Sequence, residues 1–561
     1  MAKQNYNKNG FKNNSNIENN FYNPYAFVPL NDKVYLLSKE ELKDLEQVYD
    51  VPFKDGISGK IVVDFEAITP ICVKSSQEEN TNVDGRYFIP GTSLKGMIRS
   101  VFEIITLSNF RNGIANSRLS MRDLRSDDYV LKAPKKPQKS GLLIQLNNEF
   151  YILPCDSKAL KYSDIEKQTM TQGLKYCKSI SEKYKKIPSV FEQGGKYSMW
   201  FFSGFMNNKE HEFLFDIPMS FNSEDLIPLQ EDEYQDFRFI HEIENKNASW
   251  TYWKKKIKNY SSVDAIKSDS YRGIAPCFFR EFTKEGKQCV KDLGFAFLYR
   301  QPYPKKMHGF LPSSHVEGGV DLPQSVFGYV KGEKALKGRV QFGNAFIDNA
   351  KIEAKKAFVL GSPKPSFYPF YVEQKGDSKL ETYFSKTTKL SGYKRYLIHQ
   401  KCENGVEVTD KNKRVVSIFK PLSAGTKFSV TIYFHNLKDY ELGALLAAIT
   451  FCNKYEKCYH SLGYAKPFGY GKLKVRGVKV DSDSNISDET LYERYVSKMC
   501  ERLMLNDEQA LLGLFDYLFL LASGNYANKS GGIRYPDMQK KEFNAIKNKK
   551  HSIKTFSPKK N

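Results

Sequence analysis

Residues 86–105, RYFIPGTSLKGMIRSVFEII, decide the fold more than any other stretch of the chain. Apolar side chains recur there at intervals of three and four positions, a spacing typical of a helix that buries one stripe. We therefore predict a helix that begins near Thr92, with Thr92 or Ser93 as its N-cap residue. The stripe consists of Leu94, Met97, Ile98, Val101, Phe102 and Ile105.

The start of this helix combines features that favour the binding of a phosphate group. Pro90 and Gly91 let the chain turn sharply and let its backbone approach a bulky group. Lys95 and Arg99 stand four positions apart and off the apolar stripe, beside N–H groups and a helix dipole that attract anions. The alternative for this segment taken alone is an ordinary amphipathic helix with solvated cations.

The composition indicates a polyanionic partner. Lys and Arg number 86 against 64 Asp and Glu, which leaves a net charge of +22. Aromatic residues make up 14% of the chain, and many of its 35 tyrosines lie beside lysine or arginine, which suits base stacking next to phosphate neutralisation. With 561 residues, the chain is long enough for roughly two to four domains, or for one domain with large insertions.

The sequence contains no apolar run long enough to span a bilayer and no signal-peptide segment at its polar start. We therefore expect a cytoplasmic protein without membrane contact. Its nine cysteines include no CxxC pair, so reduced thiols are expected rather than a disulfide framework.

Strand and helix patterns follow one another in the order β-α-β-β-α-β. Alternating apolar and polar residues are typical of half-buried strands, and the longer three-and-four spacing is typical of helices. The order predicts an α+β fold with a ferredoxin-like core of the RNA-recognition type, spread out by insertions. The series is a strand at 57–69, a helix at 93–106, strands near 339–347 and 427–434, a helix at 440–453 and a strand at 471–480.

Residues 460–474, HSLGYAKPFGYGKLK, form a second notable segment. Its glycines would allow close approach to a nucleic-acid backbone, its lysines would neutralise phosphates and its aromatic rings would stack on bases. Two other basic segments are predicted to add phosphate contacts from Arg339, Lys394 and Arg395. The residues predicted to act within 460–474 are Gly463, Gly469 and Gly471, then Lys466 and Lys472, then Tyr464, Phe468 and Tyr470.

Three segments together resemble the RAMP superfamily of CRISPR-associated proteins. IPGTSLKGMIRS at 89–100 is similar to the family's helix start, VFGYVKGEKALKGRVQFGNAF at 326–346 to its FG…GR segment, and LGYAKPFGYGKLKV at 462–475 to its C-terminal glycine-rich loop. The resemblance implies an RNA-binding subunit that holds CRISPR RNA in an antiviral ribonucleoprotein effector of the type III kind. It also implies target RNA and other effector subunits as partners, with the helix start and the glycine-rich loop lining the RNA-binding face.

The resemblance also suggests how the chain is divided. The core is expected in two parts, 51–135 and 285–480. The region between them, 136–284, reads as an insertion or a second subdomain. An asparagine-rich extension (1–50) precedes the core, and a helical extension with a basic tail (481–561) follows it.

RNA cleavage is a second function that the resemblance allows, either of repeat RNA or of target RNA. Some members of the family cut target RNA with an aspartate between the first strand and the first helix, where a carboxylate can hold a divalent metal such as Mg²⁺. That loop here offers Glu78, Glu79 and Asp84. Other members process repeat RNA without metal, through a general base such as histidine, for which His460 is a candidate. An Asp-Gly pair is equally typical of a turn, and His460 forms no recognisable pair, so enzymatic activity stays open.

Two further alternatives concern the remaining histidines and cysteines. Cys452, Cys458 and His460 could approach one another, but their spacing matches no strong zinc signature, so unliganded thiols are expected. His308, His315 and His399 are expected to form hydrogen bonds or to contact RNA. A protein scaffold whose charge serves partner docking is the third functional hypothesis.

Overall fold

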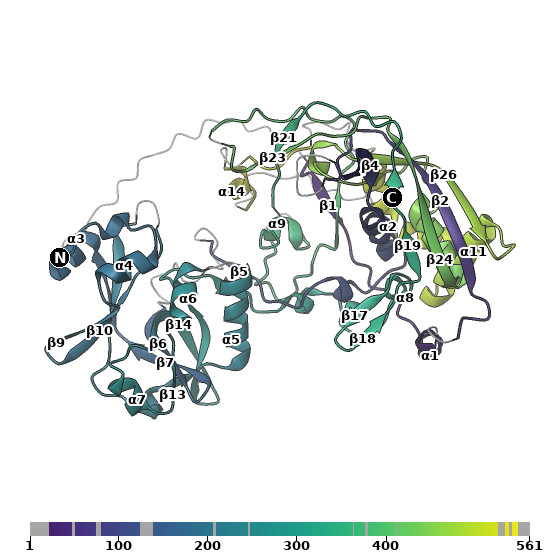
Figure 1. The fold of residues 1–561 in the computed structure, drawn as a ribbon. Helices are drawn as coiled ribbons and strands as arrows, with labels where there is room; N and C mark the ends of the chain where they lie inside the picture. Colours follow the sequence, from purple (N-terminus) through teal and green to yellow (C-terminus); the bar gives the residue numbers. More distant parts are fainter. Residues whose placement is uncertain are drawn as a thin grey trace. The chain divides into compact units, whose positions relative to one another are not determined.

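The computed structural model describes residues 22–47, 51–74, 80–123, 129, 138–205, 209–244, 247–362, 364–375, 380–410, 412–524, 533–537 and 541–547. The chain divides into two compact units, each with its own sheets and its own hydrophobic cluster (Figure 1). Unit 1 comprises Met1–Gly113, Leu311–Thr382 and Thr387–Asn561, and unit 2 comprises Ile114–Phe310 and Tyr383–Lys386.

Unit 1 is built around an antiparallel sheet with the strand order β19-β24-β2-β26-β25. The mixed α+β class is confirmed, and the elements occur in the predicted order β-α-β-β-α-β (Figure 1). These six elements are β2 (Ile57–Ala67), α2 (Gly91–Ile105), β19 (Val340–Phe342), β24 (Lys427–Leu437), α10 (Asp439–Thr450) and β26 (Lys472–Ser482). The remaining strand of the sheet is the short β25 (His460–Ser461), which precedes β26.

The inward-facing side chains of this sheet pack against α2 and α10. Phe65 of β2 stacks on Phe428 of β24 with ring centroids 5.6 Å apart, and both rings are buried. Helix α10 is buried along almost its whole length because α11 (Asp488–Leu503) covers a further side of it. Side chains alternate between the two faces of a strand, so a shift of one residue would expose this core, and the register is therefore strongly specified.

The N-terminus of α2 differs from the prediction. Pro90 occupies the N-cap position, and no side chain of α2 itself caps the helix, so the predicted capping by Thr92 or Ser93 is wrong. The side-chain oxygen of Asn344 instead accepts a hydrogen bond from the N–H of Gly91 at 2.9 Å. A residue distant in sequence thus satisfies a backbone donor that local side chains usually satisfy.

Smaller elements complete unit 1. Strand β1 pairs with β22 in a separate two-stranded sheet, and β4 pairs with β3 and β20. The strands are β1 (Tyr25–Val28), β3 (Asn82–Val83), β4 (Arg86–Ile89), β17 (Tyr329–Lys331), β18 (Lys334–Leu336), β20 (Ala345–Phe346), β21 (Lys356–Val359), β22 (Tyr393–Tyr396) and β23 (Val416–Phe419). The helices are α1 (Lys39–Gln47), α8 (Leu322–Phe327), α9 (Tyr368–Tyr371), α12 (Glu508–Gly513), α13 (Asp516–Ser523) and α14 (Glu542–Lys547).

Unit 2 contains the whole of the segment 136–284 that the sequence marked as an insertion or subdomain. One of its sheets has the order β12-β7-β6-β14-β15, and a second has the order β8-β11-β10-β9. The first is formed by β6 (Lys139–Leu146), β7 (Glu149–Cys155), β12 (Ile227–Pro228), β14 (Ala275–Lys284) and β15 (Lys287–Gly294), with β13 (Asn259–Tyr260) beside β6. The second is formed by β8 (Ser157–Lys161), β9 (Val190–Gln193), β10 (Lys196–Phe201) and β11 (His211–Asp216).

Short elements complete unit 2. Strands β5 (Ser120–Met121) and β16 (Gln301–Pro302) pair with each other. The helices are α3 (Tyr162–Thr169), α4 (Ile180–Lys186), α5 (Glu231–Arg238), α6 (Ala248–Trp253) and α7 (Val263–Ser268).

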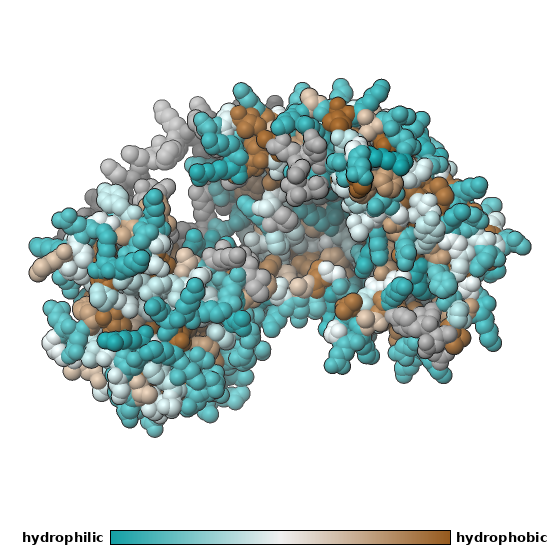
Figure 2. All heavy atoms as spheres, in the orientation of Figure 1, coloured by the Kyte–Doolittle hydropathy of each residue, from teal (hydrophilic) through white to brown (hydrophobic). Residues whose placement is uncertain are grey.

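None of the helices within the described ranges has the length and apolar character that a membrane span needs. Figure 2 shows a face of the molecule on which hydrophilic side chains predominate and apolar ones gather in scattered patches. Most of the predicted asparagine-rich extension (1–21) and the last part of the basic tail (548–561) lie outside the described residues.

Candidate nucleic-acid interface

Gly91 holds the start of α2 against the turn between β19 and β20. A Cβ atom at this position would lie 2.1 Å from the carbonyl oxygen of Phe342 and 2.7 Å from that of Gly343. Both distances are far below ordinary van der Waals contact, so protein packing already requires a glycine here. The exposed Thr92 follows, and its N–H has no acceptor within the part of the chain that the structure describes.

Two cations of α2 lie beside the ring of Phe327. The Lys95 amine is 5.8 Å from the ring centroid, and the Arg99 guanidinium is 5.7 Å from it. Arg99 is also paired with Glu103, with 2.8 Å between Nε and Oε1. Lys95 has no ion-pair partner among the described residues, and burial followed by the charge of Arg99 lowers its pKa. Lys95 is therefore the cation of α2 that is best placed to meet an outside anion.

The glycines of the glycine-rich loop (460–474) also serve packing within the protein. Each has a positive φ, and a Cβ atom on each would collide with a backbone carbonyl oxygen of unit 1. Packing within the protein is by itself sufficient to require these glycines, and close approach of an RNA backbone to them stays a prediction. The φ values are +90° at Gly463, +91° at Gly469 and +74° at Gly471, and the distances to the nearest carbonyl oxygen are 2.4, 2.7 and 1.8 Å.

The aromatic rings of this loop are packed to different degrees. Tyr470 is only 3% exposed, and its ring contacts Phe358, so its predicted stacking on RNA bases is wrong. Phe468 stacks on the same Phe358 with centroids 4.5 Å apart, which covers one of its faces. Tyr464 is partly exposed, and the amine of Lys74 lies 4.8 Å from its ring centroid. Base stacking by Tyr464 and Phe468 stays a prediction.

The two lysines of the loop lie in different surroundings. Lys472 is 8% exposed, and its amine rests 4.0 Å from the ring centroid of Tyr459, so it is largely enclosed by protein. Lys466 is partly exposed and lies 5.5 Å from the ring centroid of Tyr396. Burial, and after it the charge of Arg395, lowers the pKa of Lys466. Lys466 is therefore the more available of the two.

Lys394 and Arg395 are neighbours on β22, so their side chains point to opposite faces of that strand. The Lys394 amine lies 3.9 Å from the ring centroid of Tyr25 and donates a hydrogen bond of 3.1 Å to the hydroxyl of Tyr371. Burial lowers the pKa of Lys394. The two cations therefore do not form one continuous patch, although both were predicted to contact phosphates.

Arg395 connects α2 with the glycine-rich loop. Its guanidinium donates a hydrogen bond of 2.7 Å to the hydroxyl of Ser100 on α2, and Lys466 is close enough to act on it electrostatically. Within the described residues it has no carboxylate partner, and burial lowers its pKa to about 10. Arg395 and Lys466 are both partly exposed, and the Lys466 amine donates a hydrogen bond of 2.9 Å to the carbonyl oxygen of Gly463. Neither cation has a carboxylate partner among the described residues.

The open face of the main sheet has a different electrostatic character. Lys60 of β2 pairs with Asp481 of β26 at 3.1 Å, and Arg476 pairs with Glu66 at 2.8 Å. Each of these cations is balanced by a carboxylate on the next strand. These two cations of the sheet face are therefore less available to phosphate than Arg395 and Lys466.

Arg339 is buried in unit 1 and forms an ion pair there. Its guanidinium pairs with Glu441, with 2.8 Å between Nη1 and Oε2, and it donates to the carbonyl oxygen of Asn436 at 2.7 Å. The Arg339 and Glu441 side chains are 6% and 4% exposed. The predicted phosphate contact from Arg339 is therefore wrong, because the carboxylate of Glu441 already neutralises this charge inside the protein.

The candidate base His460 is buried, with 1% exposure. Its Nε2 atom is 2.8 Å from the carbonyl oxygen of Ile449, and burial lowers its pKa to about 3. His460 is thus a structural residue, which corrects its predicted catalytic role. His308 and His315 also make the expected hydrogen bonds, since an Nε2 atom lies 3.1 and 2.9 Å from a carbonyl oxygen in the two cases.

Asp84 lies at the exposed tip of the hairpin between β3 and β4. Asp84 has a φ of +50° and Gly85 a φ of +79°, a pair of positive values that a two-residue hairpin turn requires. The turn accounts for the Asp-Gly pair, and a catalytic role for Asp84 stays a hypothesis. Glu78 and Glu79 fall outside the described residues.

All nine cysteines are free thiols. Cys452 and Cys458 are buried, and burial raises the pKa of Cys458 to about 11. Over the ranges that the structure describes, no three His, Cys, Asp or Glu side chains are grouped so that they could hold a metal ion.

Two residues of the interface were missed from the sequence, Ser100 and Asn344. Ser100 is the last residue of the segment IPGTSLKGMIRS that carried the family resemblance, but the helix pattern does not distinguish its hydroxyl from a solvated one. Asn344 lies in the segment VFGYVKGEKALKGRVQFGNAF that carried the family resemblance, so its place within that motif was the available signal.

The family model of the RAMP superfamily matches residues 64–213. No curated protein matches the chain. Among solved structures, the crystal structure of Thermofilum pendens Csc2 matches with 11% sequence identity over 87% of this chain and 91% of that chain, but the TM-score of 0.23 is too low to support an argument. Residues 64–213 include the end of β2 and all of α2, so this part of the chain matches the RAMP superfamily, in agreement with the predicted resemblance.

Proposed function

We propose that unit 1 binds CRISPR RNA, as a subunit of an antiviral ribonucleoprotein effector of the type III kind. The RNA would follow the side of unit 1 on which α2, β22 and the glycine-rich loop meet. The strand order β26-β2-β24-β19, with α2 and α10 packed on one face, supports a ferredoxin-like core for this unit. Other effector subunits and target RNA are the further partners that this proposal includes.

The observation that carries the proposal is the pair Arg395 and Lys466. A partly buried charge without a counter-charge is unfavourable, and here two such charges lie together with no carboxylate partner among the described residues. A phosphate oxygen placed between them would remove that cost and would accept charge-assisted hydrogen bonds. Lys95 and the exposed start of α2 would extend the same path to a second phosphate.

The direct test replaces Arg395 and Lys466 by glutamine, one at a time. Fluorescence anisotropy of a labelled single-stranded RNA is measured over a salt series. Each substitution is expected to weaken binding about fivefold to tenfold and to reduce the slope of log K against log salt by about 0.7. Lys413→Gln is the matched control, because Lys413 is an exposed lysine that pairs with Asp410 at 2.8 Å.

Thermal unfolding separates an RNA-binding role from a structural one. Arg395→Gln removes a charge that has no carboxylate partner among the described residues, so the melting temperature should stay equal or rise while RNA affinity falls. If Arg395→Gln lowered the melting temperature and left RNA affinity unchanged, the residue would be structural and the proposal would fail. Equal losses of affinity for Lys413→Gln and Lys466→Gln would mean that net charge alone drives binding.

A further inference from the structure

Strand β1 pairs with β22 along one edge, and its other edge has no partner strand among the described residues. The Leu397 N–H donates to the carbonyl oxygen of Pro24 at 3.0 Å, which places Pro24 at a hydrogen-bonded position opposite β22. In an antiparallel pair of strands, hydrogen-bonded and non-hydrogen-bonded residue pairs alternate along the strand. Ala26 and Val28 therefore also hydrogen-bond to β22, whereas the N–H and C=O of Phe27 point away from it. Within the described chain these two Phe27 groups have no partner, and they are available to another strand.

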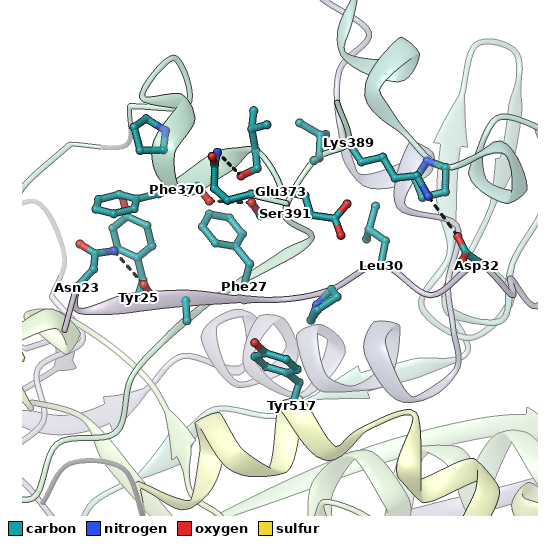
Figure 3. Close-up of a pocket in the computed structure, with 17 residues that line it drawn as sticks. Asn23, Tyr25, Phe27, Leu30, Asp32, Phe370, Glu373, Lys389, Ser391 and Tyr517 are labelled. Atoms are coloured by element: carbon teal, nitrogen blue, oxygen red, sulfur yellow. Dashed lines mark hydrogen bonds and ion pairs between the residues drawn. The ribbon is translucent and has the colours of Figure 1, made fainter. Parts of the chain in front are cut away.

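A cavity of about 390 Å³ runs along this edge (Figure 3). Ala26 and Phe27 both line it, although the side chains of successive strand residues point to opposite faces. Tyr517 of α13 lies on one side of β1, and Phe370 of α9 lies on the other (Figure 3). The cavity therefore opens onto the edge of the strand and not onto one face alone.

The lining of the cavity is apolar and acidic. Partly exposed rings and three prolines supply the apolar surface. The Glu373 carboxylate lies between Phe27 and Leu30 and has no ion-pair or hydrogen-bond partner among the described residues (Figure 3). Asp32 pairs with Lys389 at 3.6 Å, and the two side chains are 83% and 44% exposed, so water screens that pair strongly. The local charge is negative on a chain whose net charge is +22.

We propose that the β1 edge and this cavity bind an extended segment of a partner protein that carries arginine or lysine. The segment would add a strand beside β1 through the backbone of Phe27, as in other cases of strand addition. A basic side chain would reach Glu373, and an apolar one would pack against the rings and prolines of the lining. The carboxylates repel phosphate, so this site is independent of the proposed RNA path.

The peptide acetyl-Arg-Leu-Arg-Leu-Arg-amide, labelled with a fluorophore, is a discriminating probe. The strongly basic chain repels a cationic peptide overall, so binding requires a local acidic site. Glu373→Gln should weaken binding of the peptide to the full-length protein about tenfold, because a charge-assisted hydrogen bond is lost. Glu407→Gln is the control, an exposed glutamate outside the cavity lining. A peptide methylated on alternate backbone nitrogens should bind more weakly, because strand addition needs those N–H groups.

Several results would overturn this inference. The peptide could fail to bind the wild-type protein, or could bind Glu373→Gln as tightly as the wild type. Glu407→Gln could lose as much peptide affinity as Glu373→Gln, or the methylated peptide could bind as tightly as the unmethylated one. Displacement of the peptide by an adenosine trinucleotide would indicate that the cavity binds a nucleobase and not a partner protein. Glu373→Gln should leave the RNA affinity and its salt dependence unchanged, so failure here is distinguishable from failure of the proposed RNA function.

Discussion

Replacement of Gly91 by alanine separates two explanations for the glycine at the start of α2. If the glycine makes room for RNA, the variant should fold normally and bind RNA poorly. If it makes room for the β19–β20 turn, the variant should be unstable and should bind RNA normally once folded. The distances in unit 1 favour the second outcome.

The magnitude follows from the contacts of the added Cβ atom. It would lie 2.1 Å from the carbonyl oxygen of Phe342 and 2.7 Å from that of Gly343, so α2 has to move away by roughly 1 Å. Overpacking of this kind costs about 1–3 kcal/mol, and loss of the Asn344 hydrogen bond adds about 1 kcal/mol. We expect the free energy of unfolding to fall by about 2–4 kcal/mol, a large part of the stability of a typical domain.

Gly96→Ala is the matched control in the same helix. Apart from the neighbouring backbone of α2, no atom of the described residues lies within 4 Å of a Cβ atom built at Gly96, and its backbone is helical. Alanine loses less conformational entropy than glycine on entering a helix, so this variant should gain about 0.5–1 kcal/mol.

Urea unfolding followed by two probes provides the assay. The chain has three tryptophans, Trp200, Trp250 and Trp253, and all belong to unit 2. Tryptophan fluorescence therefore reports unit 2 and should not change, whereas far-ultraviolet circular dichroism should show earlier unfolding of unit 1. The reasoning is refuted if Gly91→Ala unfolds like the wild type and its RNA affinity falls.

Two further predictions concern buried polar groups of unit 1. Glu441→Gln leaves the Arg339 guanidinium buried without its counter-charge, so urea unfolding should show a loss of about 3–5 kcal/mol. Burial lowers the pKa of His460 to about 3 and that of His399 to about 4, below the unfolded value of about 6.5. The unfolded state therefore binds protons first as the pH falls, and stability is full above pH 6.5 and declines from about pH 6.5 towards pH 4. His460→Leu should reduce by about one the number of protons taken up on unfolding in this pH range. Urea unfolding at several pH values measures this number as the slope of the unfolding free energy against pH, and an unchanged slope would contradict the lowered pKa of His460.

Local periodicity was sufficient to predict the elements of the unit 1 core. The apolar stripe of α2 and the alternation in β2 and β24 depend on residues a few positions apart, and the structure has these elements within a few residues of the expected bounds. The RAMP resemblance rested on the order of short motifs, and residues 64–213 confirm it. The sequence also predicted free thiols, since its cysteines show no paired spacing.

The site depended on partners that are distant in the chain. Gly91 and Asn344 are 253 residues apart, and Arg395 and Ser100 are 295 residues apart. No local pattern distinguishes Arg339, which Glu441 neutralises, from Arg395, which has no carboxylate partner in the described chain. Which positive charges are neutralised inside the protein is therefore a property of the tertiary structure.

Local patterns and composition were sufficient to predict the order of the strands and helices, the basic character of the chain and its resemblance to the RAMP superfamily. Only the tertiary structure shows which glycines, aromatic rings and cations pack within the protein and which are exposed to a partner. The reason is physical: a side-chain pattern of period two or 3.6 is set by neighbours in the chain, whereas burial and charge compensation are set by groups that only folding brings together.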